Sequence, residues 1–333
     1  MSLTRFIAMA AVCAVIFGGA FPGGSRLSSA AQMAVVAQHM TQAPEGPEDP
    51  LWNRTAAVLI AVQGRGGPDN KQETVYTKAL YTNDSLYFLF RWMDPTRSVI
   101  KRSWKFDGHQ WLHLPGDEDR IAVLFEITRI NHFATRGCAV TCHSPPEVPK
   151  EGWKLATENP AERGDLWHWK AARSDPYHHA DDSWLTVAGR PTGSYRETGR
   201  ISDGGDGGDV TNETEDGSRP LYMQDPTRKA SVPGFLLFEE SIQIRDYSIF
   251  KAGDVIPYRL PRRPSGSRFD VKAVSRHDNG AWSLMLYRKL NTGHDDDVIF
   301  DPRKSYSFAM AVFDDSGADH SKATQPLVLK FSR

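Results

Sequence analysis

Short runs rich in β-branched and aromatic residues recur along this 333-residue chain, and they constrain its fold more than any other feature. Turn clusters such as PGDED, HDNG and DDSGAD separate the runs. Many short strands without alternating helices predict a mainly β protein, an antiparallel β-sandwich with long loops and few short helices. The predicted strands are AAVLIAVQ (56–63), TVYTKALY (74–81), SLYFLFRW (85–92), RIAVLFEI (120–127), RFDVKAVS (268–275), AWSLMLYR (281–288), YSFAMAVF (306–313) and PLVLKF (326–331).

Side chains alternate along these runs as they do in strands. In AWSLMLYR, one face carries Trp282, Leu284, Leu286 and Arg288, and the residues between them fall on the other face. The middle of the chain, from about 137 to 265, is rich in loop-forming residues. We therefore expect the strands to come mainly from the two flanks of this middle region.

The first 31 residues have the features of a secretory signal peptide. Arg5 precedes the apolar run FIAMAAVCAVIFGGAF, which is too short to span a bilayer comfortably, and small residues lead to a cleavage site near Ala31. A retained N-terminal anchor is the alternative. We expect a periplasmic protein, with residues 32–53 as an extended N-terminal arm and 54–333 as a single β-sandwich domain.

The cysteines carry the most specific chemical signal. Cys13 would leave with the signal peptide, so that only Cys138 and Cys142 remain, with His143 directly after them. The spacing C-x-x-x-C-H has one residue more than the C-x-x-C-H signature of covalently attached haem c. A small disulfide is the alternative, since exported proteins often contain one. A zinc site would need further ligands at suitable spacing, and none follows. The motif predicts one haem c, attached through Cys138 and Cys142, with His143 as an iron ligand.

A haem that transfers electrons generally has a second axial ligand. Met223, in PLYMQDP, is the first candidate, His168 in DLWHWKAARSDP is the second, and Lys170 is the third. If DLWHWK is extended, Trp167 and Trp169 share one face, and His168 and Lys170 share the other.

The residues around DLWHWK allow two interpretations. Trp167 and Trp169 suit the walls of a haem pocket, or else a tryptophan-rich core. Arg173 suits an ion pair with a haem propionate, or else an exposed position.

Other patterns exclude several functions. The 40 basic residues balance 41 acidic ones without a basic cluster, which argues against a nucleic-acid partner. After the leader no apolar stretch reaches membrane length, so no membrane span is expected in the mature chain. Hydrolase, P-loop and dinucleotide motifs are missing from the sequence.

Acidic segments raise the question of metal binding. The glycine-rich segment 201–218 contains Asp203, Asp206 and Asp209, which suggest calcium, but the remaining ligands of a calcium loop do not follow. We therefore expect 201–218 to be a flexible acidic loop. DPYHHADDSW (175–184) is expected to be a polar loop, since adjacent side chains in an extended segment point apart, and HDDD (294–297) is expected to be a turn.

Six motifs occur in a fixed order along the chain: FRWMDPTRS (90–98), DGHQWLHLPGDEDRIAVLFEI (107–127), GCAVTCH (137–143), DLWHWKAARSDP (165–176), PLYMQDP (220–226) and GAWSLMLYRKL (280–290). Together they resemble the ethylbenzene dehydrogenase-related haem-binding domain. That family includes the γ subunits of type II members of the dimethyl sulfoxide reductase family, among them nitrite oxidoreductase-like complexes. The resemblance covers roughly residues 50 to 331.

This resemblance implies a β-sandwich that holds one haem at one end and exchanges electrons with a molybdenum enzyme. In γ subunits with non-covalent haem b, the iron ligands are Met and Lys. GCAVTCH resembles a c-type variant instead, so the resemblance does not assign a Met and Lys pair of iron ligands to this sequence. The expected protein is a periplasmic monohaem c-type cytochrome and not an enzyme on its own. Its partners would be a molybdopterin catalytic subunit with an iron–sulfur subunit, or a soluble cytochrome. The alternative is an exported carbohydrate- or ligand-binding module with a Cys138–Cys142 disulfide.

Overall fold

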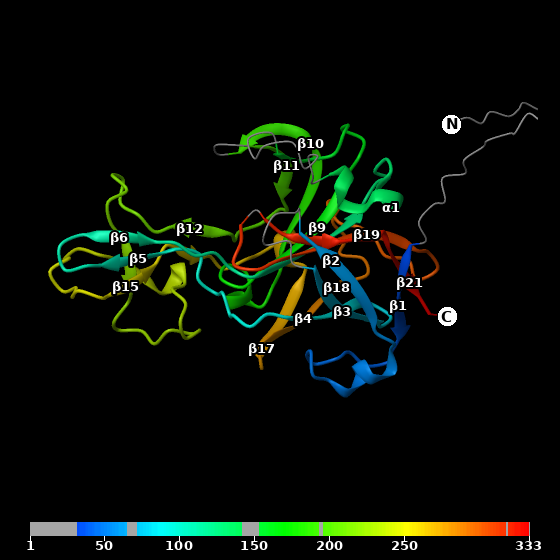
Figure 1. Ribbon diagram of the computed structural model, residues 1–333, viewed down its shortest axis with the longest axis horizontal. Coiled ribbons are helices and arrows are strands. Elements are labelled where there is room, and N and C mark those ends of the chain that lie inside the picture. Colours follow the sequence, from blue (N-terminus) through cyan, green and yellow to red (C-terminus); the bar gives the residue numbers. More distant parts are fainter. Residues whose placement is uncertain (1–31, 65–71, 142–152, 193–195, 318, 333) are drawn as a thin grey trace, which may run out of the picture.

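The computed structural model describes residues 32–64, 72–141, 153–192, 196–317 and 319–332 (Figure 1). The predicted signal peptide lies outside these residues, and so do Cys142 and His143. The described chain is mainly β, with one short α-helix, so the predicted fold class is confirmed. The helical segments are α1 (Phe133–Arg136) and the 3₁₀ turns η1 (Pro50–Arg54), η2 (Gly137–Val140), η4 (Asp175–Tyr177), η5 (Phe238–Glu240) and η6 (Ser267–Phe269).

A large mixed sheet of 14 strands forms the main body of the protein. Along the sheet the strand order is β17-β18-β4-β3-β1-β21-β19-β7-β9-β10-β11-β8, and β2 and β20 pair between β3 and β19. The strands are β1 (Met33–His39), β2 (Val58–Gln63), β3 (Gln72–Tyr81), β4 (Ser85–Met93), β7 (Arg120–Glu126), β8 (Trp153–Leu155), β9 (Gly164–Lys170), β10 (Asp181–Thr192), β11 (Arg196–Ser202), β17 (Lys272–Asp278), β18 (Ala281–Lys289), β19 (Tyr306–Phe313), β20 (Ser321–Ala323) and β21 (Leu327–Phe331).

The sheet folds over into two layers that bury one aromatic core. Phe88 on β4 packs against Phe125 on β7 and Trp167 on β9, with ring centroids 6.1 and 6.3 Å apart. Trp92 on β4 likewise packs against Trp169 on β9 at 6.2 Å. Strands β3, β4, β17 and β18 therefore form one layer, and β19, β7, β9 and β10 form the other.

The β17–β18 hairpin shows how the local sequence produces a layer. The turn between the strands is Asn279-Gly280, and both residues have positive φ, as a tight two-residue hairpin turn requires. On β18, Trp282, Leu284 and Leu286 point into the core, while Met285 packs on the outer face of the layer. The predicted alternation of this strand is confirmed.

Most of the remaining predicted strands also form, each within a few residues of its expected bounds. The expected arm, residues 32–53, contributes a strand: β1 pairs in parallel with β21 and β3. The loop-rich middle contains β9, β10 and β11, which complete the second layer. Alternation was visible in DLWHWK, but β10 and β11 have too few apolar residues to be recognised.

A smaller lobe lies beside the sandwich, at the left of Figure 1. Its own core contains Trp104, Leu236, Tyr258 and Leu260. Its strands are β5 (Ser103–Phe106), β6 (Trp111–Leu114), β15 (Val255–Pro257), β12 (Asp209–Thr211), β16 (Arg259–Pro261), β13 (Tyr222–Gln224) and β14 (Ser241–Gln243).

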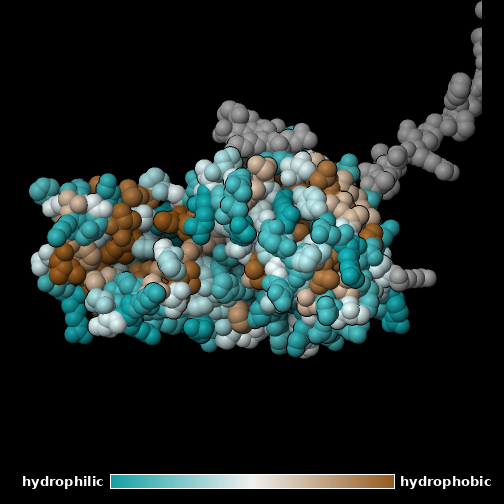
Figure 2. Space-filling view, turned by 90° about the horizontal axis from the view of Figure 1, so that it is seen from below, coloured by the Kyte–Doolittle hydropathy of each residue, from teal (hydrophilic) through white to brown (hydrophobic). Residues whose placement is uncertain are grey.

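The surface of this lobe carries several exposed apolar side chains. Figure 2 shows hydrophobic residues gathered on it. Four large apolar side chains on or beside its strands are exposed by 39 to 52%: Leu112, Ile242, Ile249 and Val255. Exposed apolar side chains gathered on one lobe are a feature of protein–protein contacts.

Candidate functional site

Two adjoining cavities lie on the outer face of the β19–β7–β9–β10 layer. One has a volume of about 390 Å³ and the other about 330 Å³, and both are lined by Cys138, Ala309 and Met310. They therefore meet beside the side chain of Cys138. The outward-facing residues of the strands under them include Ala122 and Ala311, whose small side chains leave room above the sheet.

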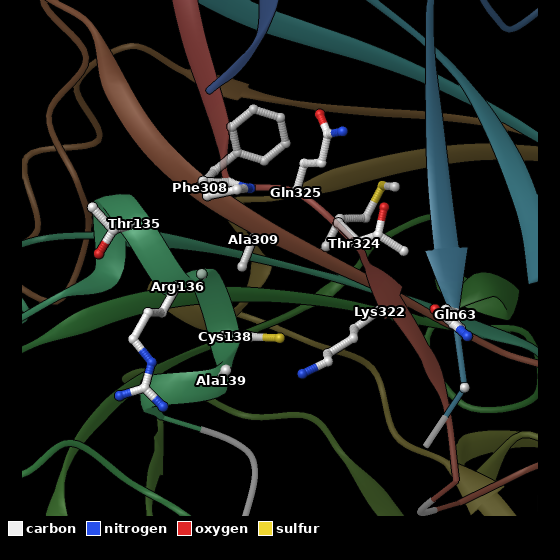
Figure 3. Close-up of a pocket in the computed structure, with 15 residues that line it drawn as sticks. Gln63, Thr135, Arg136, Cys138, Ala139, Phe308, Ala309, Lys322, Thr324 and Gln325 are labelled. Carbon is white, nitrogen blue, oxygen red and sulfur yellow. The ribbon is translucent and has the colours of Figure 1, made fainter. Parts of the chain in front are cut away.

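Cys138 is held by the short turn η2, directly after α1. Its side chain is buried in an apolar cluster with Phe133, Leu166 and Ala309. In Figure 3, the thiol of Cys138 and the side chain of Lys322 extend toward each other across the larger cavity. Cys138, one of the two predicted attachment residues, thus faces this cavity. The other, Cys142, lies just outside the described residues.

The smaller cavity is strongly basic. Each carboxylate beside this cavity forms ion pairs with at least two lysine or arginine side chains. The basic side chains therefore outnumber the carboxylates that neutralise them. Such a set suits the carboxylates of a bound ligand. The basic residues that line this cavity are Lys101, Arg120, Lys170, Arg173 and Arg200.

The ion pairs show this sharing directly. Asp181 accepts from Lys170 at 2.5 Å, from Arg200 at 3.2 Å and from Arg268 at 2.7 Å. Their charges hold the pKa of Asp181 far below its usual value, although burial opposes this. Burial lowers the pKa of Lys170 to about 7, so its amine is much easier to deprotonate than an exposed lysine.

Arg120 and Arg173 form a second group at the same cavity. Arg120 pairs with Asp117 and, at 3.4 Å, with Glu118. Arg173 pairs with Glu118 at 2.6 Å and with Asp209 at 3.2 Å. Arg173 was predicted from the sequence as a propionate partner, and the structure places it in the cavity lining.

His168 lies on the same face of β9 as Lys170, as expected for an extended DLWHWK segment. Arg200 Nη1 donates to His168 Nδ1 at 3.2 Å, while Nε2 is buried and has no hydrogen-bond partner among the described residues. Burial holds the pKa of His168 well below its usual value, so the imidazole is neutral. A neutral buried ring that lines a cavity is chemically suited to bind a metal.

His320 lines the same cavity, and sequence reasoning missed it. Its ring packs on Phe313 with centroids 4.7 Å apart, and Phe313 packs on His168 at 5.5 Å. The segment around His320 is polar and resembles an ordinary loop. Only the pairing of β20 with β19 and β2 brings it to the site.

The other predicted site residues lie elsewhere. Trp167 and Trp169 are fully buried in the core between the layers and face away from the cavity, as in the second of the two interpretations. Met223 lies on β13 in the smaller lobe, where it packs with the cluster around Trp104. The structure therefore brings Cys138 together with His168, Lys170 and Arg173, and it does not bring Met223 to them.

The residues present fit a haem. A buried thiol lines the cavity, small side chains leave space above the sheet, and bases can pair with two propionates. A neutral imidazole and a lysine with a lowered pKa are available on the strand below the cavity. An imidazole is among the groups with which proteins bind haem iron.

The fold and the cavity together define a class of protein, a mainly β sandwich with a basic, thiol-containing cavity on the outer face of one layer. Residues 49–325 match the family model described as ethylbenzene dehydrogenase. The chain belongs to this family, whose members bind haem. Family membership suggests a place in a larger complex. In the part of the chain that the structure describes, no helix is long and apolar enough to cross a membrane.

Solved structures that match the chain include a carbohydrate-binding module and a putative carbohydrate-binding protein. A family 9 carbohydrate-binding module from Caldicellulosiruptor kristjanssonii in complex with glucose is 8% identical, with a TM-score of 0.37, and the match covers 90% of this chain and 95% of that one. A putative carbohydrate-binding protein from Bacteroides uniformis is also 8% identical, with a TM-score of 0.38 and coverage of 91% and 100%. A search of curated proteins finds no match.

Proposed function

We propose that this protein is a periplasmic monohaem c-type cytochrome that transfers electrons to or from a molybdopterin oxidoreductase complex. Cys138 and Cys142 would attach the haem, and His143 would bind the iron. The observation that carries the proposal is the position of Cys138, whose buried thiol opens onto the cavity that His168, Lys170 and the basic side chains line.

A bound haem would supply reversible one-electron chemistry, and the chain would supply its surroundings. Arg173, and with it Arg120 and Arg200, would pair with the propionates. Each of them shares its carboxylate partners with other bases, so its charge is only partly compensated. The apolar cluster around Cys138 would exclude water from one side of the group. Burial and ligand identity then set the reduction potential.

The distal ligand is proposed to be His168 through Nε2. Arg200 is a donor only, so Nδ1 accepts and the ring proton lies on Nε2 in this structure. Ligation would therefore require Arg200 to leave Nδ1 and the ring proton to move from Nε2 to Nδ1. A propionate partner for Arg200 would favour that movement. Lys170 is the next candidate, since it lies on the same face of β9 and its pKa is lowered to about 7.

Replacing His168 should test this assignment. The variant His168→Ala is expected to convert a low-spin haem spectrum to a high-spin one, because one axial ligand is lost. Optical and electron paramagnetic resonance spectra of the purified proteins measure this. Met223→Ala is the matched control, since Met223 lies in the smaller lobe and its loss should leave the spectrum unchanged. A low-spin spectrum in His168→Ala together with a changed one in Met223→Ala would reverse the assignment.

The partner is proposed to be a molybdopterin catalytic subunit with an iron–sulfur subunit, or a soluble cytochrome. The exposed apolar side chains of the smaller lobe support contact with another protein, because a monomer seldom leaves so many together in water.

A haem stain after denaturing electrophoresis tests the proposal as a whole. The full-length chain, produced in a bacterium that attaches haem c, is expected to retain the stain, because thioether bonds survive unfolding. Sugar-binding assays on the same material would address the alternative function. An unstained, colourless protein that binds oligosaccharides would refute the cytochrome and support a carbohydrate-binding module.

A further inference from the structure

A second group of charged residues is buried between the layers, apart from the cavity. Four carboxylates are at most 4% exposed: Asp165 on β9, Asp182 on β10, Asp203 after β11 and Asp297 after β18. Arg288 on β18 pairs with Asp165 at 2.7 Å and Asp297 at 2.6 Å, and lies 3.7 Å from Asp182. A single guanidinium thus faces several buried carboxylates, and a buried charge without compensation is strongly unfavourable.

Asp203 is the least compensated of these groups. It is 4% exposed, and neither carboxylate oxygen has a hydrogen-bond partner among the described residues. Asp203, Asp296 and Asp297 each bring a carboxylate oxygen to within 4.8 Å of the other two. Two oxygens that bind one Ca²⁺ at about 2.4 Å lie at most about 4.8 Å apart. The three side chains are therefore already close enough to share one ion.

Neighbouring residues orient this set and leave it accessible. Ser267 donates to Asp296 at 3.0 Å, and Thr292 donates to Asp297 at 2.5 Å. A hollow of about 480 Å³ reaches Asp296 and is lined by Gly204 and Gly205, which directly follow Asp203. Water could enter through it and complete the coordination of an ion.

We propose that Asp203, Asp296 and Asp297 bind a divalent cation of the Ca²⁺ class. Oxygen-only ligands and several carboxylates suit this hard cation better than a transition metal. The site would join the end of β11 to the loop after β18, and so tie one layer of the sandwich to the other. It is separate from the cavity because β10 alternates: Asp181 pairs with cavity residues, while Asp182 faces the buried cluster.

Thermal unfolding and calorimetry of the full-length protein test the site. After treatment with EDTA, 5 mM CaCl₂ at pH 8 is expected to raise the melting temperature by several degrees and to give a binding heat near one ion per chain. A smaller response to MgCl₂ is expected, because Mg²⁺ demands a tighter octahedron. No binding heat and no change of melting temperature with Ca²⁺ would overturn the proposal, and an equal response to Mg²⁺ would overturn the choice of Ca²⁺.

Two variants distinguish an effect on Ca²⁺ binding from an effect on the stability of the folded protein. Asp203→Asn is expected to lower Ca²⁺ affinity at least about tenfold, because it removes one carboxylate ligand. It is expected to remain as stable as the parent in EDTA, because the amide nearly matches the carboxyl group in size. Asp295→Asn is the matched control, since it makes the same change at an exposed position beside Asp296 and should bind as the parent does. Equal affinity in both variants would refute the site. The haem stain should be retained in both, so this test is independent of the proposed cytochrome function.

Discussion

Replacing both Cys138 and Cys142 with serine should abolish the haem stain completely. Each thiol is proposed to form one thioether bond, and no other cysteine remains in the mature chain if the signal peptide is removed. Cys138→Ser alone should leave a single bond and a shifted pyridine haemochrome spectrum, because one vinyl group stays unreacted. Densitometry of the stained gel and the haemochrome spectra of the same samples measure both effects.

Cys13→Ser is the control for this experiment. It removes a thiol from the segment that we expect to be cleaved, so haem content should equal that of the parent protein. Circular dichroism should show that the double variant keeps its β structure, because Cys138 contributes only part of one apolar cluster beside the core. A stain that persists in the folded double variant would contradict covalent attachment through these residues.

The main strands could be predicted because each contains an alternation of apolar residues that is local to its own sequence. Alternation in residues 281–288 shows which side chains share a face, and burial of Trp282 and Leu284 follows from their chemistry. The same reasoning paired His168 with Lys170 and separated both from Trp167. It could not show which face of β9 meets the core, because aromatic residues suit a cavity wall as well as a core.

Long-range contacts account for what the sequence does not reveal. Met223 was favoured as a ligand on the basis of its neighbouring prolines, but β13 pairs with β14, and this pair packs in the smaller lobe. Asp203 and Asp209 were considered together because of their spacing. In the structure Asp209 pairs with Arg173 and Arg259, while Asp203 lies beside Asp297 from a distant loop. Local spacing cannot reveal a site whose members come from separate strands.

The acidic cluster also explains why an arginine, Arg288, is buried between the layers. It is 1% exposed, and besides its two carboxylates it donates to the carbonyl of Val298 at 2.7 Å. Its guanidinium lies over the ring of Trp167, 4.9 Å from the ring centroid. The side chain thus joins β18 in one layer to β9 in the other.

Arg288→Met should therefore destabilise the fold by about 3–5 kcal/mol, because Asp165 and Asp297 would lose their buried partner. Urea unfolding followed by circular dichroism measures the free energy of unfolding. The loss should be larger at pH 8 than at pH 5, since burial raises the pKa of both carboxyl groups and protonation at low pH removes their uncompensated charge.

Arg276→Met provides the comparison, because it breaks an arginine–aspartate pair of similar length on the neighbouring strand. Arg276 and Asp278 lie 2.9 Å apart, but their side chains are 58 and 51% exposed. Water and salt screen such a pair, so its loss should cost under about 1 kcal/mol and change little with pH. If the two variants lost similar stability, the charge network around Arg288 would not be the connection between the layers that its geometry indicates, and apolar packing alone would hold the sandwich together.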